Sequence, residues 1–177
     1  KTNSNNKQMQ QADIEKNIRT MHEGDLPNCF ASLIQKSPLA ASTIVHQNNS
    51  LQTYGEISEA ELAALQLTVS VHNGDSYGIA MYGSFLQKCQ VSQDDINEIK
   101  WGGLPLAAKE LQPVVKLVRL ILARRGTLSD NEKQYFEDNG FGKQRMFQVT
   151  TCIAQTSIVN YANNVSKSTI DDMYNTK

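Results

Sequence analysis

Hydrophobic residues recur along most of this chain at intervals of three and four, the spacing that places them on one face of an α-helix. In the first such segment, Ile14, Ile18 and Met21 share a face. Residues 111–125 are so apolar that we expect a central helix there, and residues 143–165 have the pattern of one long helix. Short runs rich in Val and Ile lie inside these longer patterns and have no alternating polar face. The chain therefore predicts an all-α fold of about six to eight helices.

Capping residues mark where several of these helices begin. Ser58 with Glu61, and Ser129 with Glu132, have the Ser-x-x-Glu spacing of a capping box. In such a box the serine accepts a backbone N–H, and the glutamate accepts the N–H of the cap residue. The helix after the first box is expected to end at Asn73-Gly74, because this pair favours a turn. Further helices are expected over residues 29–35, 39–46, 76–88, 92–100 and 130–139.

Three polar segments have little to bury. Residues 1–11 are rich in Asn and Gln and predict a flexible, frayed extension. Residues 47–54 are predicted to form a turn, and residues 166–177 a loose polar tail. Between the two ends, residues 12–165 are long enough to form a single helical domain with a substantial core.

Charge and composition exclude some classes of function. The net charge is −1, with 17 basic and 18 acidic residues, so no basic surface for nucleic acid or an anionic membrane is expected. No apolar run approaches the roughly 20 residues of a membrane span. A cytoplasmic location is the default expectation. Since the first residue is Lys, a removed signal peptide, and hence a periplasmic location, is the alternative.

The reactive residue types are sparse and far apart. Cys29, Cys89 and Cys152 are odd in number and widely separated, which does not indicate a disulfide framework. We interpret them as small, largely buried apolar residues. His22 and His46 have no partner at ligand spacing. The sequence therefore predicts neither a metal site nor a cofactor.

The residues that could take part in catalysis or binding lie between positions 72 and 82. Asp75 can be interpreted as a catalytic acid or base with a new role, or as the N-cap of the helix that begins at Ser76. We favour the N-cap. His72 either pairs with Asp75 across the turn or lies at the surface, which is the commoner place for a lone histidine near a helix end. Tyr77 and Tyr82 either bind a ligand oxygen or pack with their hydroxyl groups hydrogen-bonded.

An ordered set of short matches extends from about residue 37 to residue 165 and resembles the carboxymuconolactone decarboxylase and alkylhydroperoxidase D family of small helical proteins. No single match is specific, but the order and spacing of the set are. The matching pieces are Ser37-Pro38, Ile57-Ser58-x-x-Glu61, Leu67-Thr68-Val69-Ser70, Asn73-Gly74, Val91-Ser92 with Ile96, Arg125-Gly126-x-Leu128-Ser129, Asn160 and Asn163.

The resemblance implies a redox site whose residues this chain lacks. Redox-active members have Cys-x-x-Cys-x-x-x-His after the Asn-Gly pair, and these positions fall on Asp75, Gly78 and Tyr82. An upstream glutamate falls on Ala63, with Glu61 two residues before it. Thiol chemistry requires a thiolate, which neither Asp nor Gly supplies. Whether the chain is an enzyme therefore stays open, although its family label would be peroxidase or decarboxylase.

Two interpretations follow. In the first, the chain is a degenerate, non-thiol member of the family that serves as a ligand-binding or scaffold protein. Its expected pocket lies at the family's active-site positions: His72, Asp75, Tyr77, Gly78 and Tyr82, with Glu61. In the second, it is a peroxidase working through Cys89 or Cys152, or a decarboxylase-type enzyme using Asp75 and His72. The resemblance also implies a homo-oligomer, a trimer or a hexamer, with a small molecule of unknown identity as ligand.

Overall fold

The computed structural model describes residues 2–175, apart from the side chains of residues 2–9, 52 and 54. Every regular element in this range is helical, which confirms the all-α prediction. The helices are α1 (Thr2–Met21), α2 (Asn28–Lys36), α3 (Pro38–Tyr54), α4 (Glu59–His72), α5 (Ser76–Lys88), α6 (Gln93–Lys100), α7 (Gln112–Arg124), α8 (Asp130–Asp138) and α9 (Lys143–Ser166), with short 3₁₀ helices η1 (Lys109–Leu111) and η2 (Asp172–Tyr174).

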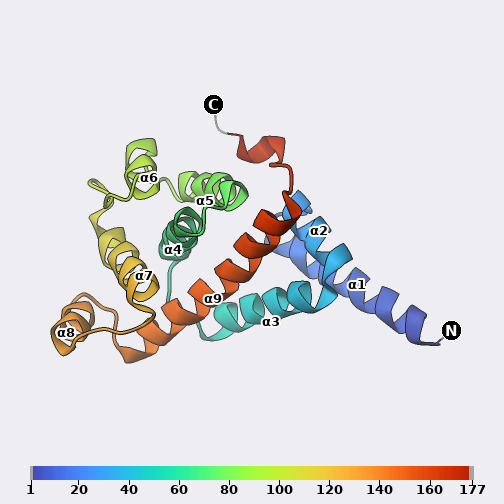
Figure 1. Ribbon diagram of the computed structural model, residues 1–177, viewed down its shortest axis with the longest axis horizontal. Coiled ribbons are helices and arrows are strands. Elements are labelled where there is room, and N and C mark those ends of the chain that lie inside the picture. Colours follow the sequence, from blue (N-terminus) through green and yellow to red (C-terminus); the bar gives the residue numbers. More distant parts are fainter. Residues whose placement is uncertain (1, 176–177) are drawn as a thin grey trace.

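Helix α4 lies at the centre, because it packs against α5, α6, α7 and α9. Helix α9 crosses the whole molecule, with α2 and α3 on one side and α4, α5 and α7 on the other (Figure 1). The apolar face predicted for α7 is buried through Val114, Val115 and Val118. Within the described part of the chain, no helix has both the length and the apolar character needed to span a bilayer.

The predicted caps are present. Ser58 and Ser129 each accept the backbone N–H of the glutamate three residues later, and each glutamate side chain accepts the backbone N–H of its serine. Helix α4 ends at His72, immediately before Asn73-Gly74, where Gly74 has a φ of +64°. Helix α5 then begins directly after Asp75. The local sequence therefore brings the end of α4 and the start of α5 together at this turn.

Two predicted boundaries differ from the structure. Residues 47–54 do not form a turn, because α3 continues to Tyr54. The polar side chains there have a place in the fold: Gln47 Nε2 donates to the carbonyl oxygen of Thr151 on α9 over 2.7 Å. At the N-terminus, α1 begins at Thr2, so residues 2–11 are helical in place of the predicted frayed extension. Residues 7–12 are Lys, Gln, Met and Ala, which all favour a helix.

The C-terminal tail also differs from the loose segment predicted. Tyr174 is buried, and its ring packs edge-on against the rings of Tyr77 and Phe85, with centroids 6.1 Å away in each case. Asp171 accepts a hydrogen bond from the backbone N–H of Asn28 at the start of α2. Residues 171–174 therefore cover one face of α5, and residues 176–177 lie outside the described range.

Candidate functional site

Asp75 is the centre of a buried polar network formed by Ser70, Asn73, Asp75, Asn160 and Asn163, here called the Asp75 network. Its Oδ1 accepts the backbone N–H of Tyr77 over 3.1 Å, as the predicted N-cap of α5. Its Oδ2 accepts from Asn160 Nδ2 over 2.7 Å and from Asn163 Nδ2 over 3.1 Å. Only 1% of Asp75 is exposed. Among the described residues, this carboxyl group is therefore held by neutral amides and a helix N-terminus and not by a cation.

The network continues into both neighbouring helices. Asn160 Nδ2 also donates to Ser70 Oγ over 3.0 Å, and Asn160 Oδ1 accepts from Asn73 Nδ2 over 3.1 Å. Asn164, one turn further along α9, donates to the carbonyl oxygen of Asn73 over 2.9 Å. The end of α4, the start of α5 and the C-terminal part of α9 are thus joined through one set of side chains.

Gly78 leaves no room for a side chain beside this network. A Cβ at Gly78 would lie 2.5 Å from Ser70 Oγ, 2.7 Å from Asp75 Oδ2 and 2.8 Å from Asn160 Nδ2. These separations are well below ordinary contact distance, so any larger residue would have to displace a hydrogen-bonded group. The space expected to hold a pocket is therefore filled at Gly78 by the network itself.

Tyr77 and Tyr82 face a second cluster, the tyrosine layer, formed with Cys29, Phe85 and Tyr174. The Tyr77 hydroxyl donates to Asp171 Oδ2 of the tail. The Cys29 thiol lies within hydrogen-bonding reach of the same hydroxyl. Both tyrosines are almost wholly buried, and burial raises the pKa of each phenol above its ordinary value. At neutral pH both side chains are consequently packed, protonated phenols, and the Tyr77 hydroxyl is hydrogen-bonded.

The three thiols share one electrostatic property. Burial raises the pKa of Cys29 to about 12 and that of Cys152 to about 11. Burial, followed by the neighbouring Glu59 carboxylate, also raises the pKa of Cys89. All three side chains are therefore thiols at neutral pH, whereas a reactive cysteine is a thiolate.

The other two predicted site residues lie elsewhere. His72 is exposed, and the described residues include no hydrogen bond between His72 and Asp75. Glu61 lies eleven residues before His72, about 16 Å away along α4 at 1.5 Å per residue. There it caps the helix and forms a half-buried ion pair with Arg145, at 2.8 Å. The structure therefore brings together Asp75, Tyr77, Gly78 and Tyr82, but not His72 or Glu61.

The sequence did not predict several residues of these clusters as site residues. Asn160 and Asn163 were identified only as matches to the family, although two asparagines three residues apart on an apolar helix indicate a shared polar contact. Cys29 and Asp171 gave no signal, because 48 and 94 residues separate them from Tyr77. Only the fold brings them to α5.

His22 is a buried imidazole at the end of α1. Its ring lies 4.9 Å from that of Phe30 and 5.9 Å from that of Phe85, centroid to centroid. Neither ring nitrogen has a hydrogen-bond partner among the described residues. Burial, and secondly the charge of Lys88, lower its pKa from 6.5 to about 4. His22 is therefore neutral at physiological pH.

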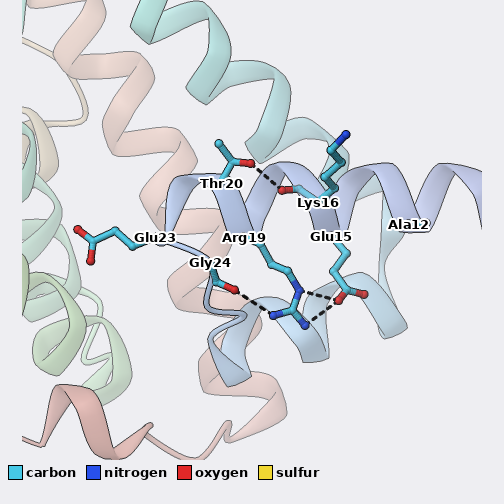
Figure 2. Close-up of a pocket in the computed structure, with 7 residues that line it drawn as sticks. All are labelled: Ala12, Glu15, Lys16, Arg19, Thr20, Glu23 and Gly24. Atoms are coloured by element: carbon cyan, nitrogen blue, oxygen red, sulfur yellow. Dashed lines mark hydrogen bonds and ion pairs between the residues drawn. The ribbon is translucent and has the colours of Figure 1, made fainter.

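A shallow hollow of about 690 Å³ lies away from these clusters, along α1 and the turn after it. Figure 2 shows Arg19 turned toward Glu15 and toward the carbonyl oxygen of Gly24, with Glu23 pointing away. Because the Arg19 guanidinium is already paired with Glu15, this charged group of the hollow is not free. Elsewhere among the described residues, no three His, Cys, Asp or Glu side chains are placed to hold a metal ion.

Comparison with known proteins gives a likeness in structure alone. No protein-family model matches the chain, and neither does the sequence of any curated protein. Among solved structures it is similar to the alkylhydroperoxidase AhpD core of a peroxidase-related protein from Ralstonia eutropha JMP134. The TM-score is 0.78 with 14% identity, over 92% of this chain and 87% of the other. This chain therefore has the helical fold of the alkylhydroperoxidase AhpD core.

Proposed function

We propose that this protein is a non-thiol relative of the alkylhydroperoxidase D family, and that it uses the fold as a scaffold rather than as a dithiol peroxidase. One observation carries the proposal. Asp75 and Gly78, which occupy the positions of the two thiols by resemblance, lie inside a closed and hydrogen-bonded network. A buried network whose polar groups are all paired rigidifies a fold and leaves no group free to react.

The properties of the cysteines support the same proposal. A peroxidase that had moved its reaction to another cysteine would need a thiolate that a hydroperoxide can reach. Cys29 and Cys152 are buried, and the pKa of all three thiols is raised. Cys29 is the thiol nearest the old site, yet its raised pKa makes it a poor nucleophile.

A decarboxylase-type reaction has less support. It would need an acid and a base that both reach the substrate. Asp75 is buried and its oxygens accept three hydrogen bonds, whereas His72 faces solvent. The same burial favours a scaffold over a protein that binds a small molecule at this site.

The test is hydroperoxide reduction with a dithiol donor, measured on the wild type and on a Cys29→Ser, Cys89→Ser, Cys152→Ser variant. We expect no turnover above the uncatalysed rate in either protein. A family member with its cysteine pair intact is the positive control for the assay. Turnover by the wild type that disappears in the variant would refute the proposal and establish a relocated thiol site, and single replacements would identify the cysteine.

A further inference from the structure

An apolar stripe runs along the solvent side of α9. It consists of Phe147, Thr151, Ala154, Ile158, Tyr161 and Val165, and we call it the α9 face. All six residues are exposed, and Val165 and Phe147 are 86% and 65% accessible. The spacing alternates between four and three residues, which is the heptad spacing of helices that pair. The stripe extends over nineteen residues, about 27 Å of helix.

Charge is absent from this part of α9. Between Arg145 and Lys167 the sequence contains no Asp, Glu, Lys or Arg. The exposed side of a surface helix normally carries charged residues, so an uncharged and apolar one indicates a face that another surface covers. At the edge of the stripe, Gln144, Thr150 and Asn164 are exposed, polar and uncharged. This is the composition of an interface: an apolar centre with a polar rim.

We propose that the α9 face binds the α9 face of a second copy of this chain, with the two helices antiparallel about a two-fold axis. An uncharged surface meets its own copy without like-charge repulsion, which a strongly charged surface cannot do. Arg145, the charged residue nearest the start of the stripe, is neutralised by its ion pair with Glu61. A membrane is a poor alternative, because amphipathic helices that bind membranes carry Lys and Arg beside their apolar face.

The order of side-chain sizes favours the antiparallel arrangement. The stripe is symmetric in its spacing about Thr156, so a two-fold axis there places each position opposite a defined partner position. Phe147 then faces the partner's Val165, Tyr161 faces the partner's Thr151, and Ile158 faces the partner's Ala154. Each pair combines a large side chain with a smaller one, which allows the two helices to interdigitate. A parallel pairing would instead place Ala154 against Ala154 and leave a gap.

The first experiment is the mass in solution by light scattering and sedimentation equilibrium at micromolar concentration. We expect a species of twice the chain mass of 19.7 kDa, or a hexamer containing this two-fold contact. A monomer would overturn the proposal, and so would a trimer, which contains no two-fold axis.

Substitutions then test the face and its direction. Thr151→Glu and Tyr161→Lys each introduce a charge, and each should raise the dimer dissociation constant by more than about tenfold. Combined in one chain, they place opposite charges face to face in the antiparallel pair, so the double variant should recover much of the affinity. Recovery is impossible in a parallel pair, where like charges would meet. The matched control is Trp101→Glu, at a 77% exposed apolar residue outside α9, which should leave the dimer unchanged.

Each result bears on a separate part of the proposal. If neither single substitution changes the assembly, the interface lies elsewhere and the proposal is wrong. If the double variant dissociates more readily than both single variants, the antiparallel arrangement is wrong. The proposal does not depend on the absence of peroxidase activity, since the mass measurement involves no cysteine.

Discussion

Gly78→Ala is the most direct perturbation of the Asp75 network. The added Cβ would lie 2.5 Å from Ser70 Oγ and within 2.8 Å of two further polar atoms, on Asp75 and Asn160. Overpacking of this kind costs about 1–3 kcal/mol. Displacing one buried hydrogen-bonding group adds about 1–3 kcal/mol, and the better helix propensity of Ala returns up to about 1 kcal/mol. We therefore expect the free energy of unfolding to fall by a net of about 1–6 kcal/mol.

The same helix supplies a matched control. Gly83 has only the flexible end of Lys100, at 3.5 Å, and one methyl group of Ile96, at 3.8 Å, near the position of a Cβ. Gly83→Ala should consequently stabilise the protein by up to about 1 kcal/mol. Urea unfolding of both variants, followed by circular dichroism, measures the two effects under the same conditions. If both substitutions changed stability equally and in the same direction, crowding at Gly78 would not be the cause.

Three further outcomes follow from the contacts of other buried groups. Asn160→Ala should lower the free energy of unfolding, measured with urea, by at least about 2 kcal/mol, because it leaves Asp75 Oδ2 with one hydrogen-bond donor fewer. A change below about 0.5 kcal/mol would contradict this. Tyr77→Phe should cost about 1 kcal/mol and speed amide exchange in the tail, because Asp171 loses the phenol's hydrogen bond, whereas unchanged exchange would mean that other contacts hold the tail. Because the pKa of His22 is lowered in the folded protein, the neutral imidazole contributes fully to the free energy of unfolding above pH 6.5. This contribution is lost as the pH falls toward about 4, since only the unfolded chain takes up the proton in that range. The loss is about 3 kcal/mol, and a His22→Leu variant should lack this part of the pH dependence in unfolding measured between pH 7 and pH 4.5.

The fold was largely predictable because helix ends depend on local chemistry. The serine caps and the Asp75 cap satisfy backbone groups within three residues, so the information lies in short stretches of sequence. The prediction of a turn at residues 47–54 is wrong for a related reason. Their Asn, Gln and Ser side chains favour a turn locally, but α3 continues because Gln47 bonds to α9, a contact between residues 104 positions apart.

The site was predictable only in part. Asp75 as a cap followed from its place before Ser76, whereas the sequence left open whether Tyr77 and Tyr82 pack or bind a ligand oxygen. The amide donors that complete the network lie more than 80 residues away, on α9. No local sequence pattern predicts that a polar residue on a distant helix will form a hydrogen bond with a particular N-cap residue. The prediction of a loose tail is wrong because a single aromatic residue, Tyr174, anchors this otherwise polar segment.

Under the proposed relation to the alkylhydroperoxidase D family, Asp75 and Gly78 at the two thiol positions are physically coherent. A helix N-terminus stabilises negative charge, whether it belongs to a thiolate or to a carboxylate, so a start that suits a reactive cysteine also suits Asp75. Once a carboxylate there accepts from Asn160 and Asn163, these side chains occupy the space next to position 78, and only Gly fits. Gly78→Cys alone would therefore meet the same three polar atoms as Gly78→Ala. Introducing a thiol at this position would therefore require the simultaneous removal of the network.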